Sequence, residues 1–244
     1  MSQYQERFYR DFHKNANLVP YQITIDESDL YIASTNPSED IAKNALITAR
    51  ENIKNYIEKH PDFLSSLSPL NLSSNISPVS WMLQASMLCS VGPMAAVAGS
   101  VSRYVGEALL EHNDEVIVEN GGDIFISAKL PKKILIYAGD SPISMRMAIE
   151  IPAGTFGVCT SAGKVGPSLS LGKADAAIVL SADCALADAA ATLLGNFIKD
   201  ETCLQESIKT IMKIPGVIGA VGICNDKIAA AGQIKLLPVP DNFL

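Results

Sequence analysis

Residues 155–196 read TFGVCTSAGKVGPSLSLGKADAAIVLSADCALADAAATLLGN, and this stretch decides the fold of the chain. It combines a loop rich in glycine and hydroxyl groups, a short apolar strand at 176–180 and an alanine-rich helix at 184–197. Ser181 and Asp183 are suited to cap that helix. Small residues let a backbone come close to a ligand, a metal or another backbone. We therefore expect the rest of the chain to be organised around this stretch.

The loop begins with CTSAG (159–163), directly after the short apolar run at 156–158. Gly163 permits a positive φ angle, and Ser161 and Ser168 offer hydroxyl groups. Together with backbone N–H groups, they could form a nest for an anion such as a phosphate. The same composition is typical of an ordinary surface turn, and the spacing does not match a Walker loop. The residues alone leave both interpretations open.

Asp188 and Thr192 stand four residues apart on the predicted helix, so their side chains share one face. The residues between and around them are mostly alanines, which leave room beside that face. A carboxylate and a hydroxyl one turn apart suit a hard cation such as Mg²⁺. In the other interpretation, the acid is stabilised by the helix dipole and the threonine bonds to its own backbone.

The overall composition restricts the classes of partner. The chain has 244 residues, of which 48% are apolar, so it can build a substantial core. Its net charge of −7 argues against a nucleic-acid backbone or an anionic membrane as the main partner. Its five cysteines are odd in number and form no CxxC pair, which favours a reducing compartment, and we expect a cytoplasmic protein. With only three histidines, a zinc site or a histidine base is not expected.

Two stretches bear on membrane association. The N-terminal stretch MSQYQERFYRDFHKN lacks the apolar segment of a signal peptide. No charged side chain occurs at 63–102, but Ser80, Gln84 and Gly92 interrupt the apolar residues there. We therefore expect a pair of buried helices in this region and no membrane span.

The remaining chain contains both strand and helix patterns. The Asn-Gly pair within VENGGDIFI (118–126) predicts a hairpin, and the acid after the second glycine could also point into a site. Strands are predicted at 21–26, 29–33, 115–118, 124–128, 133–138, 145–151, 176–180, 217–224 and 228–236. Helices are predicted at 37–60, 79–90, 94–112, 184–197 and 201–213. We predict one α+β domain over residues 1–244, with helices packed on a mixed or antiparallel sheet and residues 1–20 as an extended arm.

Five motifs, taken in order, resemble those of the ApbE-like UPF0280 family. They are GPMAAVAG (92–99), ENGGD (119–123), CTSAG (159–163), SLSLGKADA (168–176) and LADAAAT (186–192). The resemblance covers about residues 21–236, and it implies the fold of the wider ApbE superfamily, which contains flavin transferases. Those enzymes cleave FAD and attach its FMN part to a threonine of a target protein, using magnesium.

The resemblance also implies a set of site residues and partners. Mg²⁺ would be bound by Asp188, Thr192 and a backbone carbonyl near Ala98. The following residues would line the flavin cleft: Gly121, Gly122, Asp123, Thr160, Ser161, Gly163 and Ser168. The implied cofactors are Mg²⁺ and FAD, and the implied partners are a flavin-like ligand and a redox protein. Small residues on helix faces would also fit a homodimer.

The chain departs from the ApbE pattern at two places. Gly99-Ser100 stands where ApbE enzymes carry a lysine-glycine pair, and no histidine follows His112, although ApbE enzymes carry one near the metal helix. Two functions therefore stay open. One is a magnesium-dependent enzyme acting on FAD or a related pyrophosphate. The other is a non-catalytic protein of redox or sulfur metabolism that binds a small molecule.

Cys159 allows a third hypothesis. It follows an apolar run and precedes a loop with many N–H groups, which could lower its pKa and make it a reactive thiol. A buried, inert cysteine is the alternative.

Overall fold

The computed structural model describes residues 18–162 and 172–240. Its centre is an eight-stranded sheet in which every neighbouring pair is antiparallel. In spatial order the strands are β1 (Val19–Ile25), β2 (Ser28–Ser34), β3 (Val116–Asn120), β4 (Asp123–Ala128), β7 (Gly154–Ser161), β8 (Ala176–Ser181), β9 (Val217–Cys224) and β10 (Lys227–Gly232).

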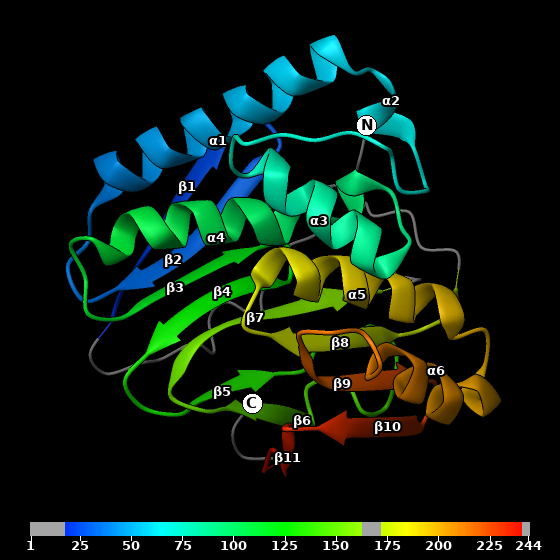
Figure 1. Ribbon diagram of the computed structural model, residues 1–244. Helices are drawn as coiled ribbons and strands as arrows, with labels where there is room; N and C mark the ends of the chain where they lie inside the picture. Colours follow the sequence, from blue (N-terminus) through cyan, green and yellow to red (C-terminus); the bar gives the residue numbers. More distant parts are fainter. Residues whose placement is uncertain (1–17, 163–171, 241–244) are drawn as a thin grey trace.

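Helices cover one face of this sheet and a small second sheet covers the other (Figure 1). The helices are α1 (Glu39–Lys59), α2 (Asp62–Ser65), α3 (Val79–Cys89), α4 (Val97–Leu110), α5 (Cys184–Phe197) and α6 (Leu204–Ile211), with short 3₁₀ turns η2 (Pro93–Ala96) and η3 (Glu201–Cys203). The second sheet consists of β11 (Lys235–Pro238), β6 (Met147–Ile151) and β5 (Lys132–Leu135), in that order. The molecule therefore has three layers.

Side chains alternate between the two faces of the central sheet, and this produces two separate hydrophobic cores. Phe125 and Cys159 point to the helices and belong to the larger core, while Ile124, Ile126 and Val158 point to the small sheet and belong to the second core. Successive side chains of a strand face opposite sides, so strands buried on both faces are apolar nearly throughout. The predicted α+β class, with helices packed on an antiparallel sheet, is confirmed.

Several predicted boundaries differ from those of the structure. Thr160 and Ser161 belong to strand β7 and not to a loop, because they continue the pairing with β8 opposite Ile178 and Ala177. The last predicted strand is split between the two sheets at Gly232, whose φ of 86° ends β10. The predicted helix at 94–112 begins with a 3₁₀ turn, and α4 proper starts at residue 97.

Within the described ranges, no single helix is both long and apolar enough to cross a membrane. Helices α3 and η2–α4 reach that length and composition only as a pair, which is bent by 110°. The predicted domain limits of 1–244 and the predicted arm at 1–20 stay predictions, since residues 1–17 and 241–244 are outside the described chain.

Candidate metal and nucleotide site

Helix α5 is the central helix of the site. Asp183 is its N-cap, and its carboxylate accepts hydrogen bonds from the backbone N–H groups of Ala185 at 2.9 Å and Leu186 at 3.2 Å. Small side chains let α5 pack closely against strands β7 and β8 and helices α3 and α4. Asp188 therefore lies in the interior, with 8% of its surface exposed.

Asp188 is fixed by the backbone of α4. The Gly99 N–H donates a hydrogen bond of 2.8 Å to Oδ2 of Asp188. A Cβ atom on Gly99 would lie 2.4 Å from the carbonyl oxygen of Cys184 and 2.8 Å from Cβ of Asp188. Only glycine allows the two helices to approach this closely, so the small residues of both motifs serve one contact.

Asp123 comes to the same region from the sheet. It follows the two-residue turn Gly121-Gly122, whose φ angles of 69° and 105° confirm the predicted hairpin. The Gly122 N–H donates to a carboxylate oxygen of Glu119 at 2.8 Å, which holds the turn in place. Asp123 shares the helix-facing side of β4 with Phe125 and is buried. Within the described chain, its Oδ1 atom has no hydrogen-bond partner.

Ser102 and Asn120 connect these two segments, and sequence reasoning missed both. The Ser102 hydroxyl lies 2.9 Å from the carbonyl oxygen of Asp123 and 3.0 Å from that of Ala98, one turn earlier on α4. The side-chain amide of Asn120 also donates to the Ala98 carbonyl, at 3.3 Å. The i to i+4 spacing of Ala98 and Ser102 was the available signal for this contact. The turn of α4 at residues 98–102 therefore contacts both segments that carry a buried carboxyl group, which are β4 with Asp123 and α5 with Asp188.

The two carboxyl groups are electrostatically unusual. Burial raises the pKa of Asp188 to about 7, although hydrogen bonds from the α4 backbone oppose the change. Burial also raises the pKa of Asp123 well above its ordinary value, and the negative charge of Asp188 raises it further. Among residues 18–162 and 172–240, no basic side chain forms an ion pair with either group. Burial of two carboxyl groups favours their protonated forms or a bound cation over two free negative charges.

The other predicted site residues do not all face the same side of the sheet. Ser161 shares the helix-facing side of β7 with Cys159, while Thr160 points to the opposite side of the sheet. Gly122 adjoins Thr160, since a Cβ atom on Gly122 would lie 3.8 Å from the Thr160 carbonyl oxygen. Thr192 is half-buried on α5, one turn after Asp188. Gly163 and Ser168 lie outside the described residues.

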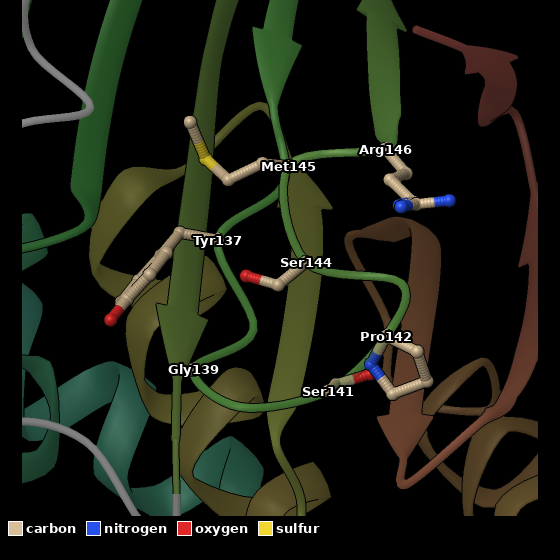
Figure 2. Close-up of a pocket in the computed structure, with 7 residues that line it drawn as sticks. All are labelled: Tyr137, Gly139, Ser141, Pro142, Ser144, Met145 and Arg146. Atoms are coloured by element: carbon tan, nitrogen blue, oxygen red, sulfur yellow. The ribbon is translucent and has the colours of Figure 1, made fainter. Parts of the chain in front are cut away.

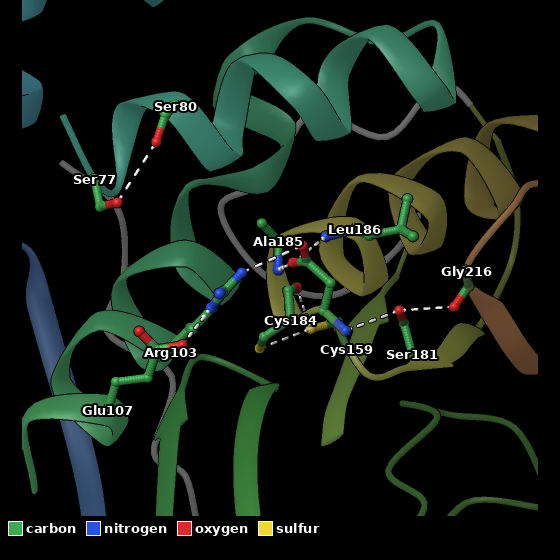
Figure 3. Close-up of polar contacts among 11 residues, drawn as sticks. Ser77, Ser80, Arg103, Glu107, Cys159, Ser181, Cys184, Ala185, Leu186 and Gly216 are labelled. Atoms are coloured by element: carbon green, nitrogen blue, oxygen red, sulfur yellow. Dashed lines mark hydrogen bonds and ion pairs between the residues drawn. The ribbon is translucent and has the colours of Figure 1, made fainter. Parts of the chain in front are cut away.

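The hypothesis of a reactive Cys159 is wrong. Cys159 is fully buried, and burial raises the pKa of its thiol well above the ordinary value. Its Sγ atom lies 3.7 Å from Sγ of Cys184, as Figure 3 shows, and both sulfurs contact backbone carbonyl oxygens. The strand continues past Cys159, so the loop whose N–H groups would have lowered the pKa does not surround it.

The site suits a hard divalent cation. Its donors are carboxylate, hydroxyl and carbonyl oxygens, which Mg²⁺ prefers, and Asp123 supplies a buried oxygen without a partner. Among the described residues, no three His, Cys, Asp or Glu side chains gather as metal ligands, so backbone or hydroxyl oxygens would have to complete the shell. The Ala98 carbonyl, predicted as such a ligand, is already contacted by Ser102 and Asn120.

A hollow of about 550 Å³ lies away from these residues, beside the loop between β5 and β6 (Figure 2). Its polar groups are largely committed to the fold. The Ser144 hydroxyl accepts from the Ala138 N–H at 2.9 Å, and the Ser141 hydroxyl donates to the Asn225 carbonyl at 2.6 Å. None of the predicted site residues lines this hollow, and the buried carboxyl groups identify the site better than its volume does.

Comparisons with known proteins identify the family of the chain. A family model described as "AbpE bacteria" matches residues 10–211. A UPF0280 protein of Methanothrix thermoacetophila is 41% identical over 208 residues, which cover 83% of this chain and 87% of that protein. A UPF0280 protein of Methanococcus maripaludis is 38% identical over 226 residues, covering 87% of this chain and 91% of the relative.

Solved structures of flavin transferases share the fold. The apo form of the Pseudomonas stutzeri flavinyl transferase ApbE has a TM-score of 0.58 at 12% identity, covering 88% of this chain and 94% of the other. The flavin transferase ApbE of Vibrio cholerae has a TM-score of 0.53 at 13% identity, covering 89% and 97%. At these identities the likeness concerns the fold.

Proposed function

The chain belongs to the UPF0280 family of ApbE-like proteins, and from that premise we propose that it binds FAD or a related pyrophosphate nucleotide with magnesium and cleaves it. The observation that carries the proposal is the pair of buried carboxyl groups, Asp123 and Asp188, held by one turn of α4. Proteins of the same fold are flavin transferases. Their fold supports the choice of ligand, and the carboxyl pair supports the need for a cation.

The residues of this chain would take distinct roles in binding. Asp188 and Thr192, with a carbonyl near Ala98, would hold Mg²⁺, which supplies positive charge to the pyrophosphate oxygens as the phosphoanhydride bond breaks. Gly99 keeps the Asp188 carboxylate in one orientation through its N–H group, so little ordering is needed on binding. Gly121 and Gly122 allow the hairpin backbone to approach a ligand, since they carry no side chain.

The remaining predicted contacts belong to the cleft wall. Ser161 would contribute its hydroxyl from the helix-facing side of β7. Thr160, whose side chain points to the opposite side of the sheet, would contribute its backbone beside Gly122, and Gly163 and Ser168 follow further along the chain. The partners we propose are a flavin-like small molecule and, for transfer, a redox protein as acceptor. A homodimer and a cytoplasmic location are part of the same proposal.

The reaction is tested by product analysis. The full chain is incubated with FAD and MgCl₂, and AMP and FMN are quantified by mass spectrometry. Hydrolysis releases both, whereas transfer releases AMP and leaves FMN on a protein. We expect AMP only with magnesium, and a loss of about a hundredfold or more in Asp188→Asn, comparable to removal of a main electrostatic contact in other enzymes.

A matched control keeps this test specific. Asp183→Asn removes a carboxylate at the start of the same helix, and asparagine still caps a helix. It should release AMP at the wild-type rate. Bound FAD that is never cleaved would contradict the enzymatic part of the proposal and leave a binding protein.

A further inference from the structure

Asp123 and Asp188 both contact the same turn of α4. The Gly99 N–H donates to the Asp188 carboxylate at 2.8 Å, and the Ser102 hydroxyl lies 2.9 Å from the Asp123 carbonyl. Asp123 points from β4 towards the helices, and Asp188 lies on α5 where α5 meets α4. The two acidic side chains therefore enter one buried region between the sheet and the helices.

Two oxygen atoms of the sheet lack partners at this place. Oδ1 of Asp123 and Oγ of Ser161 form no hydrogen bond within the described chain, although the residues are only 8% and 6% exposed. Asp123 pairs with Cys159 across β4 and β7, and Ser161 follows Cys159 by two residues, so it shares the helix-facing side. Buried polar atoms are nearly always satisfied, so a pair of unsatisfied neighbours points to a missing ligand.

The carbonyl of Ala98 is less available than these atoms. Its oxygen lies within hydrogen-bonding distance of both the Asn120 amide and the Ser102 hydroxyl. A cation coordinated by this oxygen would compete with the hydrogen bonds from both donors. A cation that used Asp123 would satisfy an orphan oxygen and neutralise a buried charge at the same time.

We propose that Asp123 is a direct ligand of a hard divalent cation, which it binds together with Asp188, with the Ser161 hydroxyl at the edge of the site. The identity of the cation as Mg²⁺ rests on the proposed function, but the inference that a cation binds here does not. A hard cation prefers such oxygen ligands, and a carboxylate on each side supplies the charge that a magnesium ion requires. The sheet thus contributes to a site that the family resemblance assigns to helices α4 and α5.

The test measures binding of the metal alone. The full chain, without nucleotide, is titrated with MgCl₂ and in parallel with MnCl₂, and the dissociation constant is measured by calorimetry. We expect Asp123→Asn to weaken binding about tenfold or more, since even outer-shell changes cost that much at metal sites. Asp188→Asn should weaken it similarly, and Asp183→Asn should not. Wild-type affinity in Asp123→Asn, or no binding to the wild type, would overturn the inference.

Thermal unfolding of the same variants gives a second readout. A cation that binds only the folded state raises its unfolding temperature, so Asp123→Asn should gain less from added MgCl₂ than the wild type does. An Asp123→Asn protein that gains as much from MgCl₂ as the wild type would contradict the inference. Ser161→Ala, a smaller change, should fold and bind metal more weakly than the wild type, and unchanged binding would exclude Ser161 from the site.

The outcomes separate this inference from the proposed function. If Asp188→Asn abolishes magnesium-dependent FAD cleavage while Asp123→Asn binds metal normally, only the role of Asp123 is wrong. If both variants bind metal normally and the wild type cleaves FAD, the metal site lies elsewhere. Neither Asp123 nor Asp188 is then a metal ligand. If both variants lose metal and FAD is not cleaved, the metal site stands without the proposed reaction.

Discussion

Gly99 is the residue on which the contact between α4 and α5 depends. Its missing side chain leaves room for the Cys184 carbonyl and Asp188, and its N–H group fixes the carboxylate. The sequence contains a cluster of small residues near 95–100, and the structure shows that its partner is Asp188 on α5. That partner lies 89 positions away in the chain, and no local pattern identifies a contact at such a separation.

Gly99→Ala should therefore separate the two helices. The added methyl group would overlap the Cys184 carbonyl, and overpacking of this kind costs about 1–3 kcal/mol of unfolding free energy. Urea unfolding followed by circular dichroism measures this change. Because the Asp188 carboxylate would lose its donor, metal affinity should fall as well. A variant with wild-type stability and affinity would show that the helices tolerate a side chain here.

Helix α5 shows what can be predicted at the scale of an element. Its limits at 184 and 197 were predicted correctly, and its cap is Asp183, one of the two capping residues predicted, because capping residues and an alanine-rich run are local signals. The end of β7 was not, since its continuation through Thr160 and Ser161 depends on pairing with β8. Figure 3 shows Arg103 reaching towards the start of α5. Its guanidinium lies 3.2 Å from the Asp183 carboxylate and 3.9 Å from the centre of the Trp81 ring on α3.

The cap of α5 can be separated from this ion pair by two variants. Asp183→Ala removes the acceptor for the N–H groups of Ala185 and Leu186, and it should cost about 0.5–2 kcal/mol of unfolding free energy. Asp183→Asn keeps the acceptor and loses only the charge, so it should cost much less, because the Arg103 pair is partly exposed. Urea unfolding of both variants measures the difference. An equal loss in the two would mean that the charge, and not the cap, stabilises the helix start.

At the scale of the whole molecule, the three layers follow from alternation along the strands of the central sheet. The adjacent strands β4, β7, β8 and β9 are buried on both faces over most of their length, so their apolar runs revealed strands but not which layer each side chain faced. The second, three-stranded sheet was not predicted as a separate layer. Its strands pair over long separations, with β11 beside β6, and only the tertiary fold determines such a pairing.

Glu115 connects the two sheets and gives the molecule an acid-sensitive contact. Burial raises the pKa of its carboxyl group, but the Lys129 N–H and the Lys132 ammonium, 3.2 Å away, more than offset this, and the pKa lies below its ordinary value of 4.5. A lowered folded-state pKa stabilises the protein above pH 4.5, and that stabilisation is lost as the pH falls through the folded-state value.

Glu115→Gln should therefore destabilise the protein at neutral pH and less so in acid. Unfolding free energies of the wild type and the variant, measured in urea from pH 7 to about pH 3, give the comparison. The difference should be constant at neutral pH and shrink once the pH falls below 4.5. Glu27→Gln, at an exposed carboxylate paired with Arg50, serves as the control and should change stability little. A Glu115→Gln difference that does not depend on pH would exclude an electrostatic origin.

Calorimetric titration can test whether this molecule binds a flavin dinucleotide through a cation held at Asp188. FAD is titrated into the full chain with and without MgCl₂, and into Asp188→Asn under the same conditions. We predict binding that requires magnesium in the wild type and is lost in Asp188→Asn. Equal binding of FAD by both proteins, or no binding by the wild type with magnesium present, would contradict binding of FAD through a cation at Asp188.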